Sequence, residues 1–157
     1  MQKLFISLLL LLPLTASSQQ LDGEWTGTQE TESIGTAPNN IVGGQEGFPI
    51  RMKLVFTWNK DSTYTVYTYT KLKSVSDSMI VCRTVCRVTG DSVFIEEVEK
   101  LQPRKTIAAC FQKMKMALWM VNGKLQLNGI WKSEGNNCDA RGFVWFRKKK
   151  HKAIPAK

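Results

Sequence analysis

Four cysteines and one histidine are the side chains of this 157-residue chain best suited to redox, metal or nucleophilic chemistry. Cys82 and Cys86 fall four residues apart in an expected strand, which separates their Cα atoms by about 13 Å, beyond the ~7 Å limit for a disulfide. Cys110 and Cys138 are therefore the favoured disulfide pair, and this bond would be worth roughly 3–4 kcal/mol in the chain-entropy model. A zinc site at Cys82 and Cys86 is the alternative, but a gap of three residues on a strand without a nearby His fits zinc poorly.

No residues are spaced for catalysis. His151, the only histidine, lies in the basic stretch that follows the last expected strand, so a His-dependent hydrolase or metalloenzyme has no candidate in the folded part. Glu97 and Glu99 would share one strand face as paired carboxylates, but cross-strand pairing with Lys113 and Lys115 is the favoured explanation. We expect no enzyme activity, no cofactor and no bound metal.

The first 18 residues predict export. A short basic start is followed by an apolar run at residues 4–14, and Ala16-Ser17-Ser18 supplies small residues before a cleavage site after Ser18. The apolar run has about half of the ~20 residues that a spanning helix needs, which favours a cleavable signal over a membrane anchor. The expected layout is a signal at 1–18, one domain at 19–147 and a basic flexible tail at 148–157. The expected location is periplasmic or secreted, where disulfides persist.

The rest of the chain predicts an all-β fold. Eight segments show the alternation of apolar and polar residues, or the Thr, Tyr and Val content, that is typical of strands. These segments span residues 23–30, 49–58, 62–70, 78–88, 92–99, 110–121, 125–131 and 141–147.

The lengths of the connections alternate along the chain. Asn59-Lys60-Asp61, Gly90-Asp91 and Asn122-Gly123 are short turns, and Asn-Gly favours a type I′ hairpin because both residues tolerate positive φ. The other connections are longer. Because alternate connections of a meander fall at opposite ends, we predict an eight-stranded antiparallel up-and-down barrel with one closed and one open end. An open sandwich of hairpins is the alternative fold.

Gly23-x-Trp25 in the first strand, with the basic residue Arg147 ending the last strand, resembles the calycin group of lipocalin-like barrels. The resemblance implies that Trp25 lies at the closed end and that Arg147 packs over its indole, a contact worth roughly 0.5–2 kcal/mol. Typical lipocalins have a C-terminal helix, and we expect none here after the last strand. In that respect the chain is similar to helix-free avidin-like barrels, although it does not carry their ligand residues.

A stripe of apolar residues from two expected strands should line the barrel interior. Methionine is flexible and polarisable, and it is frequent where a surface accepts varied apolar shapes. Two interpretations stay open, a barrel filled by its own side chains and a cavity that binds a small hydrophobic ligand. The candidate ligand-binding residues are Ile50, Met52, Leu54, Phe56, Met114, Met116, Leu118 and Met120.

The charge of the chain bears on its partners. A net charge of +9 favours acidic surfaces, and the basic run Arg147–Lys152 could attract an anionic surface, although such runs are more often solvated chain ends. Outward charges such as Arg51 and Lys53 argue against a membrane-embedded barrel, and no motif indicates nucleic acid binding. The sequence does not indicate an oligomeric state.

Two functional hypotheses follow. The first is an exported, lipocalin-like binding protein for a small apolar ligand held in the barrel mouth. The alternative is an interaction module in which a solid barrel binds a protein or a glycan through its open-end loops. The Gly- and Asn-rich loop at 31–47 would suit such adaptable recognition.

Overall fold

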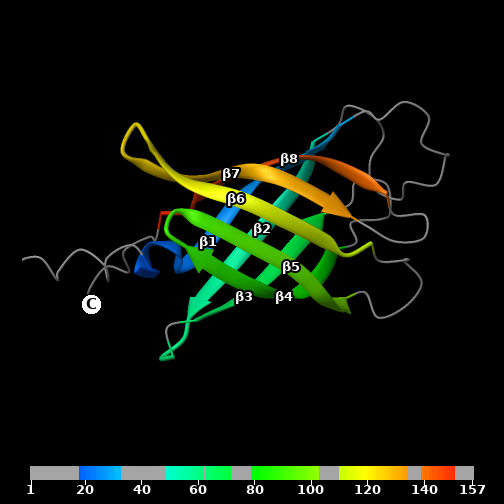
Figure 1. The fold of residues 1–157 in the computed structure, drawn as a ribbon. Coiled ribbons are helices and arrows are strands. Elements are labelled where there is room, and N and C mark those ends of the chain that lie inside the picture. Colours follow the sequence, from blue (N-terminus) through cyan, green and yellow to red (C-terminus); the bar gives the residue numbers. More distant parts are fainter. Residues whose placement is uncertain are drawn as a thin grey trace, which may run out of the picture.

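The computed structural model describes residues 18–32, 49–61, 63–71, 79–102, 110–133 and 139–150. A short 3₁₀-helix, η2 (Ser18–Leu21), precedes the strands β1 (Gly23–Thr31), β2 (Ile50–Trp58), β3 (Tyr64–Lys71), β4 (Met79–Thr89), β5 (Ser92–Gln102), β6 (Gln112–Val121), β7 (Lys124–Ser133) and β8 (Ala140–Lys148). Each strand pairs antiparallel with the next, and β1 pairs with β8, which closes the sheet into a barrel (Figure 1). The predicted all-β up-and-down barrel is confirmed.

The tight turns gather at one end of the barrel. Asn122 and Gly123 have φ values of 50° and 69°, as a type I′ turn requires, and Gly90 turns with a φ of 57°. Figure 1 shows the β4–β5 and β6–β7 turns on the same side as η2. The strand ends that flank the longer connections lie at the opposite side, so the predicted alternation of connections is also confirmed.

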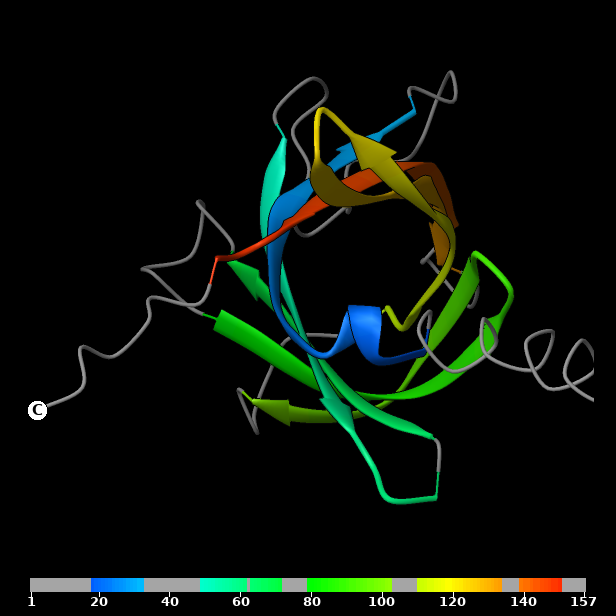
Figure 2. The ribbon, with the colours of Figure 1, turned by 90° about the vertical axis from the view of Figure 1, so that its left-hand side faces the viewer.

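Aromatic side chains fill the end that carries the turns. Trp25 is completely buried, and its indole Nε1 donates a hydrogen bond of 2.7 Å to the carbonyl oxygen of Leu21. Leu21 enters the core from η2, which lies across this end of the barrel (Figure 2). The ring of Phe56 packs edge-on against Trp25 and Tyr64, with centroid distances of 6.3 and 5.7 Å. This end is closed by the side chains of the chain itself.

Lys148, rather than Arg147, packs over Trp25. The Lys148 Nζ lies 5.8 Å from the centroid of the Trp25 ring and donates a hydrogen bond to the carbonyl oxygen of Gln20. Arg147 pairs in register with Thr26 and is exposed on the outer face. Because Val144 and Phe146 face the core, alternation puts Arg147 outside and Lys148 on the inward face. This corrects the Trp25–Arg147 contact that the resemblance implied.

The first residues after β8 continue the barrel seam. The backbone N–H of Lys149 donates to the carbonyl oxygen of Glu24 at 2.8 Å, and its Nζ pairs with the Glu24 carboxylate at 3.0 Å. The tail beyond residue 150 and residues 1–17 of the predicted signal lie outside the described residues. Within the described part of the chain, no helix has the length and apolarity to cross a membrane.

Candidate functional site on the outer face

The side chains predicted to bind a ligand inside the barrel are mostly packed against one another. Five of the eight belong to the buried core and are at most 3% exposed, namely Met52, Leu54, Phe56, Met114 and Met116. A cavity beside them would leave part of their surface accessible, so the interior is filled at these positions. Ile50 and Leu118 are partly buried and pack against the same core.

Met120 does not line the interior. Its side chain is 63% exposed, next to the turn between β6 and β7. Alternation does place it on the same strand face as Met116, but the barrel wall ends before this position, because β5 pairs with β6 only as far as Ala117. The prediction that Met120 contacts an interior ligand is therefore wrong.

Polar side chains occupy the interior nearer the other end. Glu97 is buried, and its carboxylate accepts hydrogen bonds from the hydroxyl of Thr68 and, at 3.0 Å, from the backbone N–H of Gln112. Burial raises the pKa of Glu97 above its ordinary value, and the two hydrogen bonds oppose that shift. Gln29 is also buried, and its Oε1 has no hydrogen-bond partner among the described residues.

A β-bulge explains why Glu99 does not share the inward face of Glu97, which continues the alternation of Val93 and Ile95. Arg83 of β4 pairs in register with Glu99, whereas the next residue, Thr84, pairs with Glu97. Val98 is thus an extra residue in β5, and it reverses the alternation of the strand. Glu99 consequently lies outside, where it accepts a 2.8 Å ion-pair hydrogen bond from Arg83. The prediction that Glu97 and Glu99 share one face is wrong.

The two lysines predicted as partners of these carboxylates have other neighbours. Lys113 pairs with Glu96 at an N–O distance of 3.2 Å, and the Nζ of Lys115 lies 5.8 Å from the ring centroid of Phe94. Both lysines are on the outer face of β6. They therefore contribute to the surface chemistry of the barrel.

The two cysteines of β4 are free thiols. Burial raises the pKa of Cys82 and of Cys86 to about 12, so both stay protonated at neutral pH and act as small apolar side chains. Cys138, the predicted partner of Cys110, lies outside the described residues, and that disulfide stays a prediction. No three His, Cys, Asp or Glu side chains converge as metal ligands within the described ranges.

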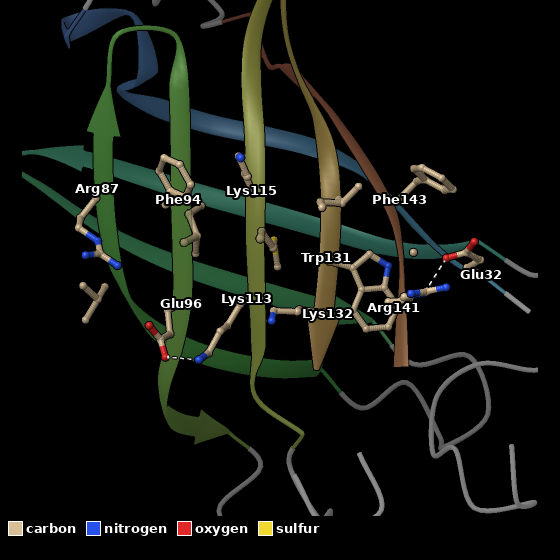
Figure 3. Close-up of a pocket in the computed structure, with 15 residues that line it drawn as sticks. Glu32, Arg87, Phe94, Glu96, Lys113, Lys115, Trp131, Lys132, Arg141 and Phe143 are labelled. Atoms are coloured by element: carbon tan, nitrogen blue, oxygen red, sulfur yellow. Dashed lines mark ion pairs between the residues drawn. The ribbon is translucent and has the colours of Figure 1, made fainter. Parts of the chain in front are cut away.

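A groove of about 660 Å³ crosses the outer face of β4 to β8 (Figure 3). The strands pair in continuous register here, so outward side chains form two rows that run across the strands. The first row consists of Arg87, Phe94, Lys115, Ile130 and Phe143. The second row consists of Val85, Glu96, Lys113, Lys132 and Arg141, with Glu32 at its end.

The backbone between these rows forms the floor of the groove. The floor residues of β5 to β8 pair in register as Ile95, Met114, Trp131 and Gly142, and the first three bury their side chains in the core. The indole Nε1 of Trp131 donates a 2.8 Å hydrogen bond to the carbonyl oxygen of Glu30 on β1, beyond β8. This bond ties the floor to the strand that closes the barrel.

The groove combines exposed apolar surface with positive charge. Ile130 is 55% exposed and Phe143 is 52% exposed. Five basic and two acidic residues line the groove, and each acidic residue already has a basic partner, Lys113 for Glu96 and Arg141 for Glu32 at 2.9 Å. The excess charge is therefore positive, and an acidic group in the groove would be favoured.

The apolar surface extends from the groove along β7 and β8. Ile130 and Phe143 also border a shallower hollow that reaches Trp145 on the outer face. Monomeric proteins seldom leave large contiguous apolar patches in water unless the patch binds something. Sequence reasoning missed this site, although the outward positions of the last strand carried a signal. Two aromatic residues, Phe143 and Trp145, stand there between Arg141 and Arg147.

Together, the fold and the groove define a closed eight-stranded antiparallel barrel with an apolar, basic outer face, and the architecture is consistent with a calycin-like fold. No family model, curated protein or solved structure matches the chain.

Proposed function

We propose that the protein is an exported, non-catalytic binding protein that holds an amphipathic anion in the groove on the outer face of β4–β8. Such a ligand has an apolar chain and an acidic head group. The observation that carries the proposal is the groove itself, in which the exposed side chains of Ile130 and Phe143 lie among cations. A volume of about 660 Å³ falls within the range of small-molecule sites, roughly 300–1,000 Å³.

The register of the strands suggests how such a ligand would lie. Lys115 stands between Phe94 and Ile130 in the first row, so its ammonium group is in place to bind an acidic head group. Ile130 and Phe143 are direct neighbours across β7 and β8 and offer an apolar surface to the chain of the ligand. Burial of that chain would supply most of the affinity, and the cation would set its orientation.

The filled core supports a surface site over a site in the barrel mouth. Met52, Leu54 and Met116 are already covered by protein atoms, so an apolar ligand among them would have to displace packed side chains. Export is part of the proposal and rests on the signal predicted at residues 1–18.

Calorimetric titration with laurate tests the proposal. Native protein should bind laurate more tightly than glyceryl monolaurate, which carries the same chain without a charge. Lys115→Glu and Phe143→Ser should each weaken laurate binding by about fivefold or more, roughly 1 kcal/mol. Arg51→Glu is the matched control, because Arg51 is an exposed cation on β2, outside the groove. Equal affinity of the native protein and Lys115→Glu would contradict the proposal.

A further inference from the structure

The hairpin formed by β6 and β7 projects beyond the barrel wall. These two strands pair with each other as far as Val121 and Lys124. On one side, β5 stops pairing with β6 at Ala117, and on the other side β8 stops pairing with β7 at Gln126. The end of the hairpin is therefore a two-stranded ribbon without a neighbouring strand, and Figure 1 shows it extending past the other strands.

The tip of this ribbon is apolar and open to solvent. Trp119 is 57% exposed and Met120 is 63% exposed, and Val121 next to them is also exposed. Because successive side chains of a strand point to opposite faces, these residues cover both faces of the ribbon. The apolar surface is thus a narrow protrusion, which differs in shape from the groove.

The hairpin that carries the apolar tip is positively charged. Residues 111–133 contain no acidic residue and carry four lysines, Lys113, Lys115, Lys124 and Lys132. Lys124 pairs directly with Val121 at the tip. Lys149, which follows β8, bonds to Glu24 near the start of β1, and its charge is paired with the Glu24 carboxylate. The hairpin therefore has the sign of charge that an anionic surface attracts, with Lys124 at its tip.

We propose that the β6–β7 hairpin docks the protein on an anionic lipid membrane. The side chains of Trp119 and Met120 enter the interfacial region, where Trp is favoured because its ring is apolar and its N–H can bond to head groups. Lys124 remains at the head groups, and each basic residue near an anionic surface favours association. A narrow ribbon can enter a fluid lipid interface without a complementary pocket. Docking on a second copy of the chain would instead require that copy to provide such a pocket.

This docking surface is separate from the proposed ligand groove. None of Trp119, Met120 and Lys124 lines the groove. The substitution Trp119→Ser/Met120→Ser should therefore leave laurate binding unchanged, and Phe143→Ser should leave membrane binding unchanged. One proposal can fail while the other stands.

Co-sedimentation with lipid vesicles tests the docking. Native protein should bind equimolar phosphatidylglycerol and phosphatidylcholine vesicles and should bind pure phosphatidylcholine vesicles much less. Trp119→Ser/Met120→Ser should lower the partition coefficient by about tenfold or more, given the apolar area lost from the interface. Lys124→Glu should lower it by roughly tenfold, because one favourable charge becomes unfavourable. Phe143→Ser is the matched apolar control, since Phe143 is similarly exposed but lies away from the tip.

Two results with the double variant would overturn the proposal. One is a double variant that binds the mixed vesicles as well as the native protein does. The other is a native dimer that the double variant converts into a monomer, because a second copy would then cover the tip.

Brominated lipids provide a measurement without substitution. They should quench the tryptophan fluorescence of the native protein bound to mixed vesicles, and an absence of quenching would also contradict the insertion.

Discussion

Lys148, in the last strand, lies over the indole of Trp25, in the first strand, with its Nζ 5.8 Å from the ring centroid. The two residues are also partners in the β1–β8 register that closes the barrel. The buried indole is in turn bonded to Leu21 of η2. This one contact therefore links the beginning and the end of the folded chain at the closed end of the barrel.

Removal of the Lys148 side chain should destabilise the fold. Lys148→Ala removes the ammonium group from the face of Trp25 together with the packing of the aliphatic stem, and we expect a loss of about 1–2 kcal/mol. Arg147→Ala is the control, because Arg147 is exposed on the outer face and should change the free energy of unfolding by no more than about 0.5 kcal/mol. Urea unfolding measures both values, and an equal or larger loss for Arg147→Ala would contradict the contact described above.

Glu97 should make the stability of the protein depend on pH. Its folded-state pKa is raised by burial above the ordinary value of 4.5, so the folded chain binds the proton more tightly than the unfolded chain does. The resulting stabilisation is present below the ordinary pKa and is lost as the pH rises through the raised pKa. Glu97→Gln should remove this loss, so at neutral pH the variant should be more stable than the native protein.

The measurement for Glu97 is the difference in unfolding free energy between variant and native protein from about pH 4 to pH 8. That difference should grow in favour of Glu97→Gln as the pH rises. Glu99→Gln serves as the control, because Glu99 lies on the surface beside Arg83. A difference that stays flat with pH, or that favours the native protein at high pH, would show that the Glu97 carboxyl is not held as described.

The thiols give a test of the cysteine assignments. Cys82 and Cys86 are free, with pKa values raised to about 12, so both should react slowly with Ellman's reagent in the folded protein. After unfolding without a reductant, two thiols per chain should react if Cys110 and Cys138 are bonded to each other. Four reactive thiols would contradict that disulfide, and rapid reaction of the native protein would contradict the burial of Cys82.

Gly129 should tolerate no side chain. A Cβ atom at Gly129 would overlap the carbonyl oxygen of Lys115 and approach the Cα of Met116 at 2.6 Å, and backbone atoms cannot move aside cheaply. We expect Gly129→Ala to cost about 2–4 kcal/mol, as overpacking and strand distortion do. A Cβ atom at Gly90 would meet no atom within 4 Å. Gly90→Ala should therefore lower the stability by only about 1–2 kcal/mol, the penalty for a side chain in the left-handed conformation. Thermal unfolding that ranks Gly90→Ala as the more damaging change would contradict this packing.

Local sequence signals were sufficient to predict the fold. Asn122-Gly123 and Gly90-Asp91 mark turns through residues that accept positive φ, and the alternation in strands such as 49–58 marks a barrel wall with one buried face. These signals act between close neighbours in the chain, so they can be read without knowledge of tertiary contacts. The strand order followed because alternate short and long connections leave few other topologies.

The errors arose where the fold departs from strict alternation. Val98 adds one residue to β5 and turns Glu99 outward, whereas Glu97 keeps the inward alternation of Val93 and Ile95. No residue type predicts a bulge of this kind. Met120 keeps the inward alternation of β6 beyond the point where the barrel wall ends, which depends on the lengths of β5 and β8. The groove could not be predicted because Phe94, Ile130 and Phe143 come from three strands, and only their register brings them into one row.

Methyl NMR during a titration with laurate tests the central claim most directly, because it separates the outer face from the interior. In protein labelled at the Ile and Met methyl groups, the signal of Ile130 in the groove should shift with laurate concentration. The signals of Met52 and Met116, which are packed in the core, should stay in place. Shifts of Met52 and Met116 with no shift of Ile130 would place the ligand inside the barrel and contradict the account.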